Sequence, residues 1–127
     1  MRRKRTFEDL IAWRKAHAFA LAVYEQTRTG ALSRDWDLSR QLRRASVSVV
    51  SNIAEGFERG SRREFAHFLS IARGSAGEAR AQLRLARDLG VIDPFAADEL
   101  LSQALEVSRV VAGLLRYLRD DCRAGSP

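Results

Sequence analysis

Apolar residues recur at intervals of three and four along most of the chain, which is the spacing of one face of an α-helix. Glycines at positions 30, 60 and 90 interrupt the pattern, and each is a residue that commonly ends a helix. The pattern therefore predicts four helices and a polar tail, over residues 8–29, 37–59, 62–89, 94–119 and 120–127.

Two of the predicted helices begin with recognisable capping sequences. Ser61 followed by Glu64 is a capping box, and Asp93–Pro94 combines an N-cap acceptor with a proline at the first helical position. Short links between helices of this length favour antiparallel neighbours. We therefore expect an all-α fold, an up-and-down antiparallel four-helix bundle, with residues 1–127 forming one domain.

Composition narrows the class of protein. The 127 residues include 2 Pro and one Cys, so neither an intrachain disulfide nor a multi-cysteine zinc site is expected. No apolar run approaches the ~20 residues of a membrane span, and the basic start lacks the apolar stretch of a secretory signal. We expect a cytoplasmic protein that does not associate with membranes.

The first and fourth segments carry more apolar residues than one buried stripe requires. In the first segment, Leu10, Ile11, Ala18 and Leu21 point away from the main apolar face. In the fourth, apolar residues flank the core stripe on both sides, namely Leu101, Leu105, Val107, Val110, Ala112 and Leu114. A second apolar face is typical of a subunit contact, so we expect a homo-oligomer.

The chain is a basic protein, with 22 Lys+Arg against 16 Asp+Glu and a net charge of +6. Arginines on the third predicted helix fall within a stripe of ~60°. Others cluster on the second helix and beside the Gly60 turn. The candidate nucleic-acid-binding residues are Arg40, Arg43, Arg44, Arg62, Arg63, Arg73, Arg80, Arg84 and Arg87.

Two interpretations of these arginines remain open. Repeated around an oligomer, the stripe becomes a band of positive charge that follows the phosphates of RNA or DNA. Alternatively, it is a solvated face, partly paired with Glu78 or Asp88, in an Arg-rich chain that reflects genome composition. Few aromatic residues are interleaved with the arginines, so stacking on single-stranded bases is not supported.

Ser48, Asn52 and Glu55 share one face of the second predicted helix, with Gly56 beside them. This polar face is either a binding surface or an interhelical or intersubunit hydrogen-bond network that fixes register. We favour the structural interpretation. Gly74 and Gly77, inside the third helix, suggest a close backbone approach by a neighbouring helix.

The sequence gives little support for a catalytic site or a metal site. Glu64-x-x-His67 matches half of a di-iron site in a helical bundle, but a second copy of the motif is missing. The single Cys lies in the predicted tail, and no Ser-His-Asp grouping is evident. We therefore expect no enzyme activity, no catalytic residues, no metal and no cofactor.

The central sequence is distinctive. The stretches Gln41–Ser48 and Ser51–Phe57, followed by Phe65, Phe68-Leu69, Gly74-Ser75 and Glu78, resemble the 23S rRNA-intervening-sequence proteins, as does the opening Phe7–Leu10. The resemblance implies a four-helix bundle that assembles as a homopentamer. It extends to the accessory proteins of diversity-generating retroelements, which are basic pentamers that bind nucleic acid. Val49-Val50 stands where many relatives have a proline.

Together, these observations predict a non-enzymatic, homo-oligomeric bundle that binds nucleic acid by charge, without base-specific recognition; the family resemblance makes a pentamer the expected form. The alternative is a protein-interaction scaffold with no nucleic-acid role.

Overall fold

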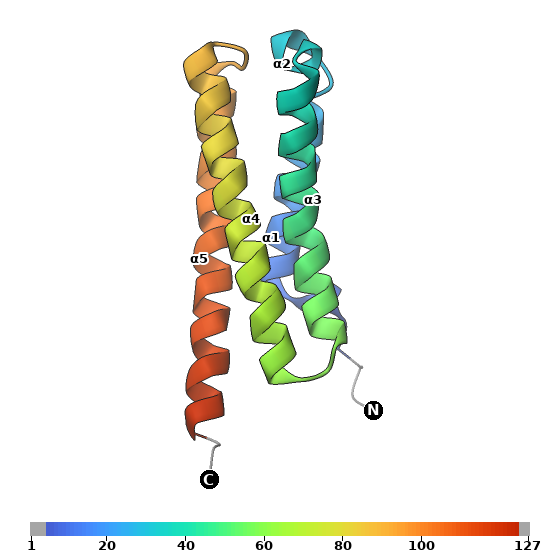
Figure 1. The fold of residues 1–127 in the computed structure, drawn as a ribbon, viewed down its shortest axis with the longest axis vertical. Helices are drawn as coiled ribbons and strands as arrows, with labels where there is room; N and C mark the ends of the chain where they lie inside the picture. The colour runs from blue at the N-terminus through green and yellow to red at the C-terminus, as the bar shows by residue number, and fades with distance from the viewer. Residues whose placement is uncertain (1–4, 125–127) are drawn as a thin grey trace.

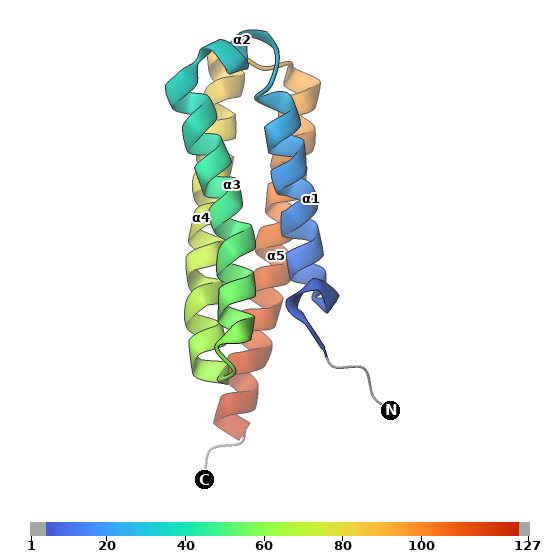
Figure 2. The same cartoon turned by 90° about the vertical axis from the view of Figure 1, so that its right-hand side faces the viewer.

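Four long helices, connected in sequence, run alternately up and down along one axis (Figures 1 and 2). The computed structural model describes the backbone of residues 5–124. Its elements are the 3-10 helix η1 (Phe7–Asp9) and the α-helices α1 (Ile11–Gln26), α2 (Gly30–Arg34), α3 (Trp36–Glu58), α4 (Arg62–Leu89) and α5 (Pro94–Ala124). The predicted all-α, up-and-down four-helix bundle is confirmed.

Each long helix packs against two neighbours. The chief contacts join α1 to α3, α3 to α4, α4 to α5, and α5 back to α1. The α1–α3 and α4–α5 seams therefore lie on opposite sides of the bundle (Figure 2). This arrangement decides which of the predicted site residues can act together.

The core combines large side chains with a run of alanines on α4. Phe19, Leu42 and Ile53 are almost fully buried, and they share one core cluster with four alanines of α4. These alanines, Ala72, Ala76, Ala79 and Ala86, have no exposed surface. Small residues at these positions let α4 lie close to its neighbours without leaving voids.

The predicted first helix, residues 8–29, is wrong at both ends. The sequence Thr6-x-x-Asp9 forms a capping box at the start of the short helix η1, and Leu10 is extended before α1 begins. At the other end, the Thr27 hydroxyl donates to the Val23 carbonyl oxygen at 2.9 Å as the helix closes. Gly30, expected to end this helix, has a φ of 72° and is the first residue of α2.

The short helix α2 occupies what the sequence suggested was a linker. Leu32 inserts into the core with 2% of its surface exposed, and the Ser39 hydroxyl donates to its carbonyl oxygen. Asp35 then caps α3 by accepting a hydrogen bond from the Leu38 N–H at 3.1 Å, so α3 begins at Trp36 instead of residue 37. These contacts explain why the link is folded.

The remaining helix bounds differ less. α4 occupies the predicted range, from Arg62 after the Ser61 cap to Leu89 before Gly90. α3 ends one residue early, at Glu58. α5 extends to Ala124, so its predicted end at residue 119 is wrong and residues 120–124 of the expected tail are helical. Residues 125–127 of that tail lie outside the described part.

Most of the apolar residues expected to form a second face on α5 pack inside the bundle. Val107 is buried, and Leu101, Val110 and Leu114 pack partly buried against the core. On α1, by contrast, Ile11 is 63% exposed. Along the described chain, no helix has both the length and the apolar character required to cross a membrane.

Candidate nucleic-acid interface

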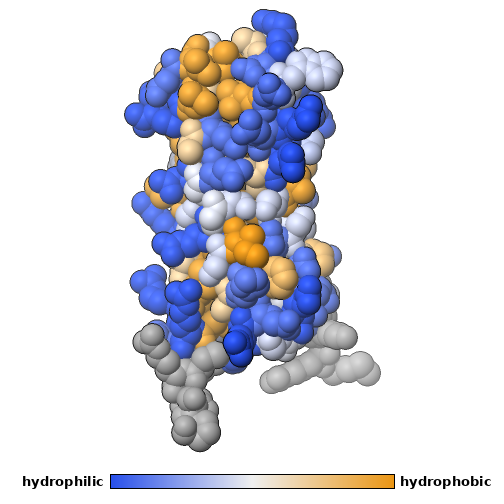
Figure 3. Space-filling view, viewed as in Figure 1, coloured by the Kyte–Doolittle hydropathy of each residue, from blue (hydrophilic) through white to orange (hydrophobic). Residues whose placement is uncertain are grey.

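A basic groove of about 590 Å³ runs along the seam between α4 and α5. Arginines from both helices converge on it, small residues line its α4 side, and no Asp or Glu among the described residues contributes to it. Figure 3 faces α4 and α5 and shows hydrophilic side chains projecting along the α5 side. The groove is lined by Ser70, Arg73, Gly74, Gly77, Arg80, Leu105, Ser108, Arg109, Ala112, Leu115 and Arg119.

Helix periodicity explains how the arginines reach this groove. Arg73 and Arg80 lie seven residues apart, which is two turns or about 10.5 Å along α4. Arg109 and Arg119 approach from α5. Among the described residues, none of these four arginines forms an ion pair. The groove is therefore lined by four arginines that form no ion pair with the described residues.

The other arginines of the predicted stripe on α4 are engaged differently. The Arg62 guanidinium lies 6.0 Å from the centre of the Tyr117 ring on α5, and Arg87 Nε lies 3.2 Å from Asp98 Oδ1. Arg84 pairs with Asp88 one turn later, at 3.9 Å. Arg62, Arg73, Arg80 and Arg87 of the stripe thus lie beside α5, and among the described residues only Arg73 and Arg80 of the stripe have no such partner.

The arginines predicted on α3 do not join this groove. Arg43 Nε donates to Thr27 Oγ1 at 2.7 Å, and its guanidinium lies 4.5 Å from the centre of the Tyr24 ring, so this side chain faces α1. Arg40 and Arg44 are exposed on the same helix, and Arg63 is exposed at the start of α4. The two predicted arginine groups therefore belong to different faces.

Sequence reasoning missed the contribution of α5 to the groove. At helical spacing, Arg109 shares a narrow polar sector of the fourth predicted helix with Ser102, Glu106, Arg116 and Asp120, so its position on the helix surface was readable from the sequence. The identity of the helix facing that sector was not readable, because it depends on the packing of α4 against α5.

The polar face of α3 lies against α4. Ser48 Oγ and Ser75 Oγ of α4 are hydrogen-bonded at 2.8 Å. The Asn52 side-chain amide donates to the Ser48 carbonyl oxygen at 2.8 Å and to Ser48 Oγ at 3.0 Å. These partly buried groups form a chain of hydrogen bonds that crosses from α3 to α4 through the Ser48–Ser75 pair.

The same seam tightens at Gly56. A Cβ placed on this glycine would lie 3.3 Å from the Phe65 carbonyl oxygen and 2.7 Å from Phe68 Cβ, and the second distance is shorter than real Cβ atoms adopt. Only a glycine lets α3 and α4 approach this closely. The motif Ser48-Asn52-Gly56 therefore follows the line of contact between the two helices.

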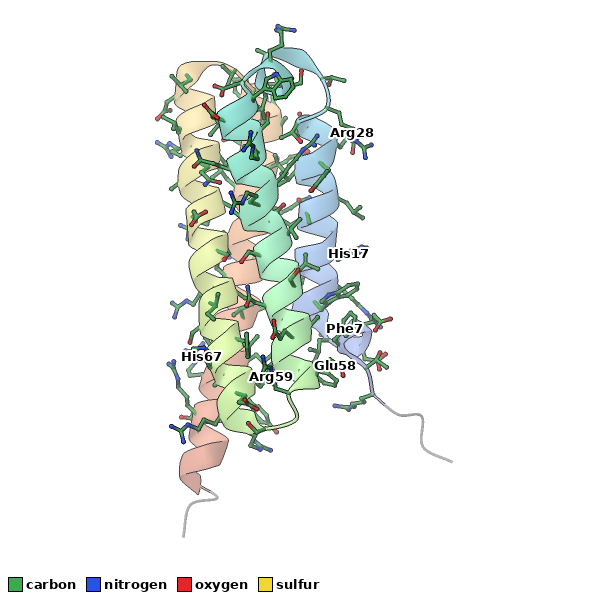
Figure 4. The ribbon with its side chains drawn as sticks, turned by 45° about the vertical axis from the view of Figure 1, so that its right-hand side comes forward. Phe7, His17, Arg28, Glu58, Arg59 and His67 are labelled. Atoms are coloured by element: carbon green, nitrogen blue, oxygen red, sulfur yellow. The ribbon has the colours of Figure 1, made fainter. Side chains whose placement is uncertain are left out.

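Arg59 closes this seam at the end of α3, where Figure 4 labels it. Its Nη2 lies 2.8 Å from Glu55 Oε2, its Nη1 lies 3.9 Å from Glu64 Oε1, and its guanidinium lies 5.1 Å from the centre of the Phe68 ring. The hydrogen bond to Glu55, reinforced by the charges of Glu55 and Glu64, raises the pKa of Arg59. The Arg59–Glu64 ion pair joins the end of α3 to the start of α4.

Gly74 and Gly77 depart from expectation. A Cβ at either position would meet no atom within 4 Å. The predicted close approach of a neighbouring helix at these residues is therefore wrong within this chain. Both glycines instead line the α4–α5 groove.

Two further features complete the surface. A second groove, of about 580 Å³, follows the α1–α3 seam and is lined by residues that include Leu21, Val47 and Val50.

The two histidines lie apart, His17 on α1 and His67 on α4 (Figure 4), and the His17 ring stacks on Trp13 at 4.7 Å. Among the described residues, no three His, Cys, Asp or Glu side chains gather as metal ligands would.

Comparisons with known proteins show a matching family model and a solved structure of similar fold. The family model described as 23S rRNA-intervening sequence protein matches residues 8–113. The fold is similar to the crystal structure of a protein of unknown function from the S23 ribosomal protein family of Bacteroides thetaiotaomicron VPI-5482, with a TM-score of 0.76. The two sequences are 21% identical over 83% of this chain and 98% of that chain. No curated protein matches the chain.

Proposed function

The chain belongs to the 23S rRNA-intervening sequence protein family, and we propose that it is a non-enzymatic, homo-oligomeric, cytoplasmic protein that binds nucleic acid. The α4–α5 groove is the proposed binding surface. Its ligand is RNA or DNA, held by charge and without base-specific recognition.

The observation that carries this proposal is the convergence of four arginines from two helices, with no carboxylate of the described residues in the lining. A guanidinium presents a planar fork of donors that matches phosphate oxygens, and it keeps its charge at any physiological pH. No aromatic side chain of the described residues lines the groove. Contacts to phosphate without base stacking give affinity that depends strongly on salt and little on sequence.

Self-association is the second element of the proposal. Leu21 is 59% exposed and Val47 is 42% exposed, and both line the α1–α3 groove, on the opposite side of the bundle from the α4–α5 groove. We propose that a second copy of the chain covers these apolar residues, as the burial of exposed apolar surface favours. The family resemblance supports a pentamer, in which five basic grooves would form one charged band.

A salt titration tests nucleic-acid binding. The wild-type protein is titrated against a fluorescently labelled 20-nucleotide single strand of two unrelated sequences, at several salt concentrations. Four phosphate contacts predict a slope of log affinity against log salt of about −2.8 for a single strand. No binding at the lowest salt concentration, or a slope near zero, would contradict the proposal.

A protein-interaction scaffold is the second candidate function. Ile71, Leu85 and Leu89 of α4 are 40–58% exposed, and Phe95 at the start of α5 is 83% exposed. Apolar residues on this face could contact another protein. Absence of oligonucleotide binding together with an intact oligomer would favour this function.

A further inference from the structure

A second basic site lies away from the α4–α5 groove, toward the end of the bundle where α2 joins α1 to α3 (Figure 2). Two hollows, of about 350 and 430 Å³, both have Arg40 and Arg43 in their lining, so together they form one site, the α3 pocket. Arg44 lines its second half. Within the described part of the chain, no Asp or Glu lines either hollow.

Arg43 is held in place from two sides. Its Nε donates to Thr27 Oγ1 at 2.7 Å, and the Thr27 hydroxyl in turn donates to the Val23 carbonyl oxygen at 2.9 Å. Its guanidinium also lies 4.5 Å from the centre of the Tyr24 ring. Neither Nη nitrogen bonds to another described residue, and neither is buried. The two Nη groups are therefore fixed and open, so an anion could bind them at little cost in side-chain freedom.

Arg40 and Arg44 add two charges beside this fixed group. They lie four residues apart on α3, so they are neighbours on the helix surface and repel each other. Both are exposed, and neither forms an ion pair with a described residue. A terminal phosphate carries a charge of about −1.5 to −2 at pH 7 and three acceptor oxygens. Three clustered guanidinium groups match that charge and that number of acceptors.

Trp36 adds an aromatic surface to the same pocket. Its side chain is 76% exposed and lines the first hollow, four residues before Arg40 on α3. Among the described aromatic residues, none stacks on this ring. An exposed indole face is a surface on which a nucleobase of any sequence can stack. The sequence alone did not indicate such stacking, because few aromatic residues alternate with the arginines.

We propose that the α3 pocket binds a nucleoside 5′-phosphate, with the base stacked on Trp36 and the phosphate held by Arg40, Arg43 and Arg44. The ring and the guanidinium groups are one to two helical turns apart along α3, at about 5.4 Å per turn, which is a span that one nucleotide covers. The ligand is either a free nucleotide or the 5′-phosphorylated end of a strand. Phosphates inside a strand carry one charge each and belong to the α4–α5 groove.

Calorimetric titration at low salt, with adenosine 5′-monophosphate (AMP) as the probe, tests the proposal. AMP should bind at least tenfold more tightly than adenosine, which lacks the phosphate, and than ribose 5-phosphate, which lacks the base. Ribose 5-phosphate binding as tightly as AMP would overturn the proposal, as would the absence of AMP binding.

A tetranucleotide with and without a 5′-phosphate distinguishes the two sources of the ligand. It is measured in the Arg73→Gln/Arg80→Gln variant, so that the α4–α5 groove contributes less. A phosphorylated strand that binds more tightly than AMP would assign the pocket to strand ends, and one that binds more weakly would assign it to free nucleotides. In both cases the phosphorylated strand should bind more tightly than the unphosphorylated strand, and equal affinities for the two strands would contradict the phosphate site.

Arg40→Gln tests the phosphate site without disturbing the contacts of Arg43. The affinity for AMP should fall about tenfold, because a charge-assisted hydrogen bond is lost. Arg63→Gln is the matched control, since Arg63 is also exposed on a helix, carries the same charge and lines neither hollow. Both variants should melt like wild type. Equal affinities of the two variants for AMP would overturn the proposal.

Trp36→Ala tests the base site. It should weaken AMP binding about tenfold and leave ribose 5-phosphate binding unchanged, because only stacking on the base is lost. Phe95→Ala is the control, since Phe95 is an aromatic residue that is 83% exposed near the start of α5 and lines neither hollow. Equal AMP affinities for these two variants would refute stacking on Trp36. A change of oligomer size in native mass spectra of Trp36→Ala would also overturn the proposal, because Trp36 would then be a subunit contact.

The groove variant separates this proposal from the proposed function. Arg73→Gln/Arg80→Gln should bind AMP like wild type, because neither arginine lines the α3 pocket. Loss of AMP binding in this variant would overturn the nucleotide site, since AMP would then occupy the α4–α5 groove. AMP binding by a wild-type protein that does not bind the unphosphorylated strand would support the nucleotide site and contradict the proposed function.

Discussion

Gly56 offers the sharpest test of how α3 and α4 pack. In Gly56→Ala the added methyl would lie 2.7 Å from Phe68 Cβ and 3.3 Å from a backbone oxygen, neither of which can move by a side-chain rotation alone. Overpacking of this kind costs about 1–3 kcal/mol. The gain in helix propensity from glycine to alanine offsets about 1 kcal/mol of that cost. Because the clash is with the first atom of a side chain, we expect a net destabilisation of about 1–2 kcal/mol.

Urea unfolding monitored by circular dichroism, at fixed protein concentration, measures this destabilisation as a lower transition midpoint with an unchanged slope. Gly113→Ala is the control, since the same methyl meets no atom within 4 Å there. It should gain about 0.5–1 kcal/mol from helix propensity and from the reduced freedom of the unfolded chain. A Gly56→Ala protein as stable as Gly113→Ala would refute the close approach of the two helices.

Substitutions at three other places in the fold give further predictions. Asn52→Ala should lower the free energy of unfolding by about 1–2 kcal/mol, because its partly buried partners lose hydrogen bonds. Its affinity for the oligonucleotide should stay unchanged. A variant that folds stably but no longer binds would instead make this face a binding surface. Asp35→Ala should cost about 1 kcal/mol in urea unfolding by removing the cap of α3, and Asp35→Asn should restore most of it. Leu21→Glu/Val47→Glu should shift native mass spectra toward the 14.3 kDa monomer, and an unchanged oligomer would place the subunit contact elsewhere.

The sequence was most informative where local signals determine structure. The Ser61 capping box and Gly90 bound α4 correctly because both act on the nearest turn of backbone. The link before α3 was misread because its helix depends on a distant contact, the burial of Leu32 in the core. Local periodicity likewise extended the predicted first helix to residue 29, although α1 ends at Gln26.

The same distinction between local signals and distant contacts applies to the candidate site. The arginine stripe of α4 follows from helix periodicity alone, and the structure keeps Arg73 and Arg80 on one seam. The partner arginines of α5 and the separation of Arg40 and Arg44 from that seam depend on the order of helices around the bundle. The open space at Gly74 and Gly77 likewise depends on how far α4 stands from its neighbours.

The central claim is that nucleic acid binds at the α4–α5 groove and not by overall charge. The most direct measurement compares the salt dependence of oligonucleotide binding for Arg73→Gln/Arg80→Gln and Arg40→Gln/Arg44→Gln. Each double variant removes two exposed arginines from one helix, so the net charge of both is the same. We predict that the groove variant flattens the slope for a single strand by about 1.4, while the α3 variant keeps the wild-type slope. Equal slopes for the two variants would contradict the claim.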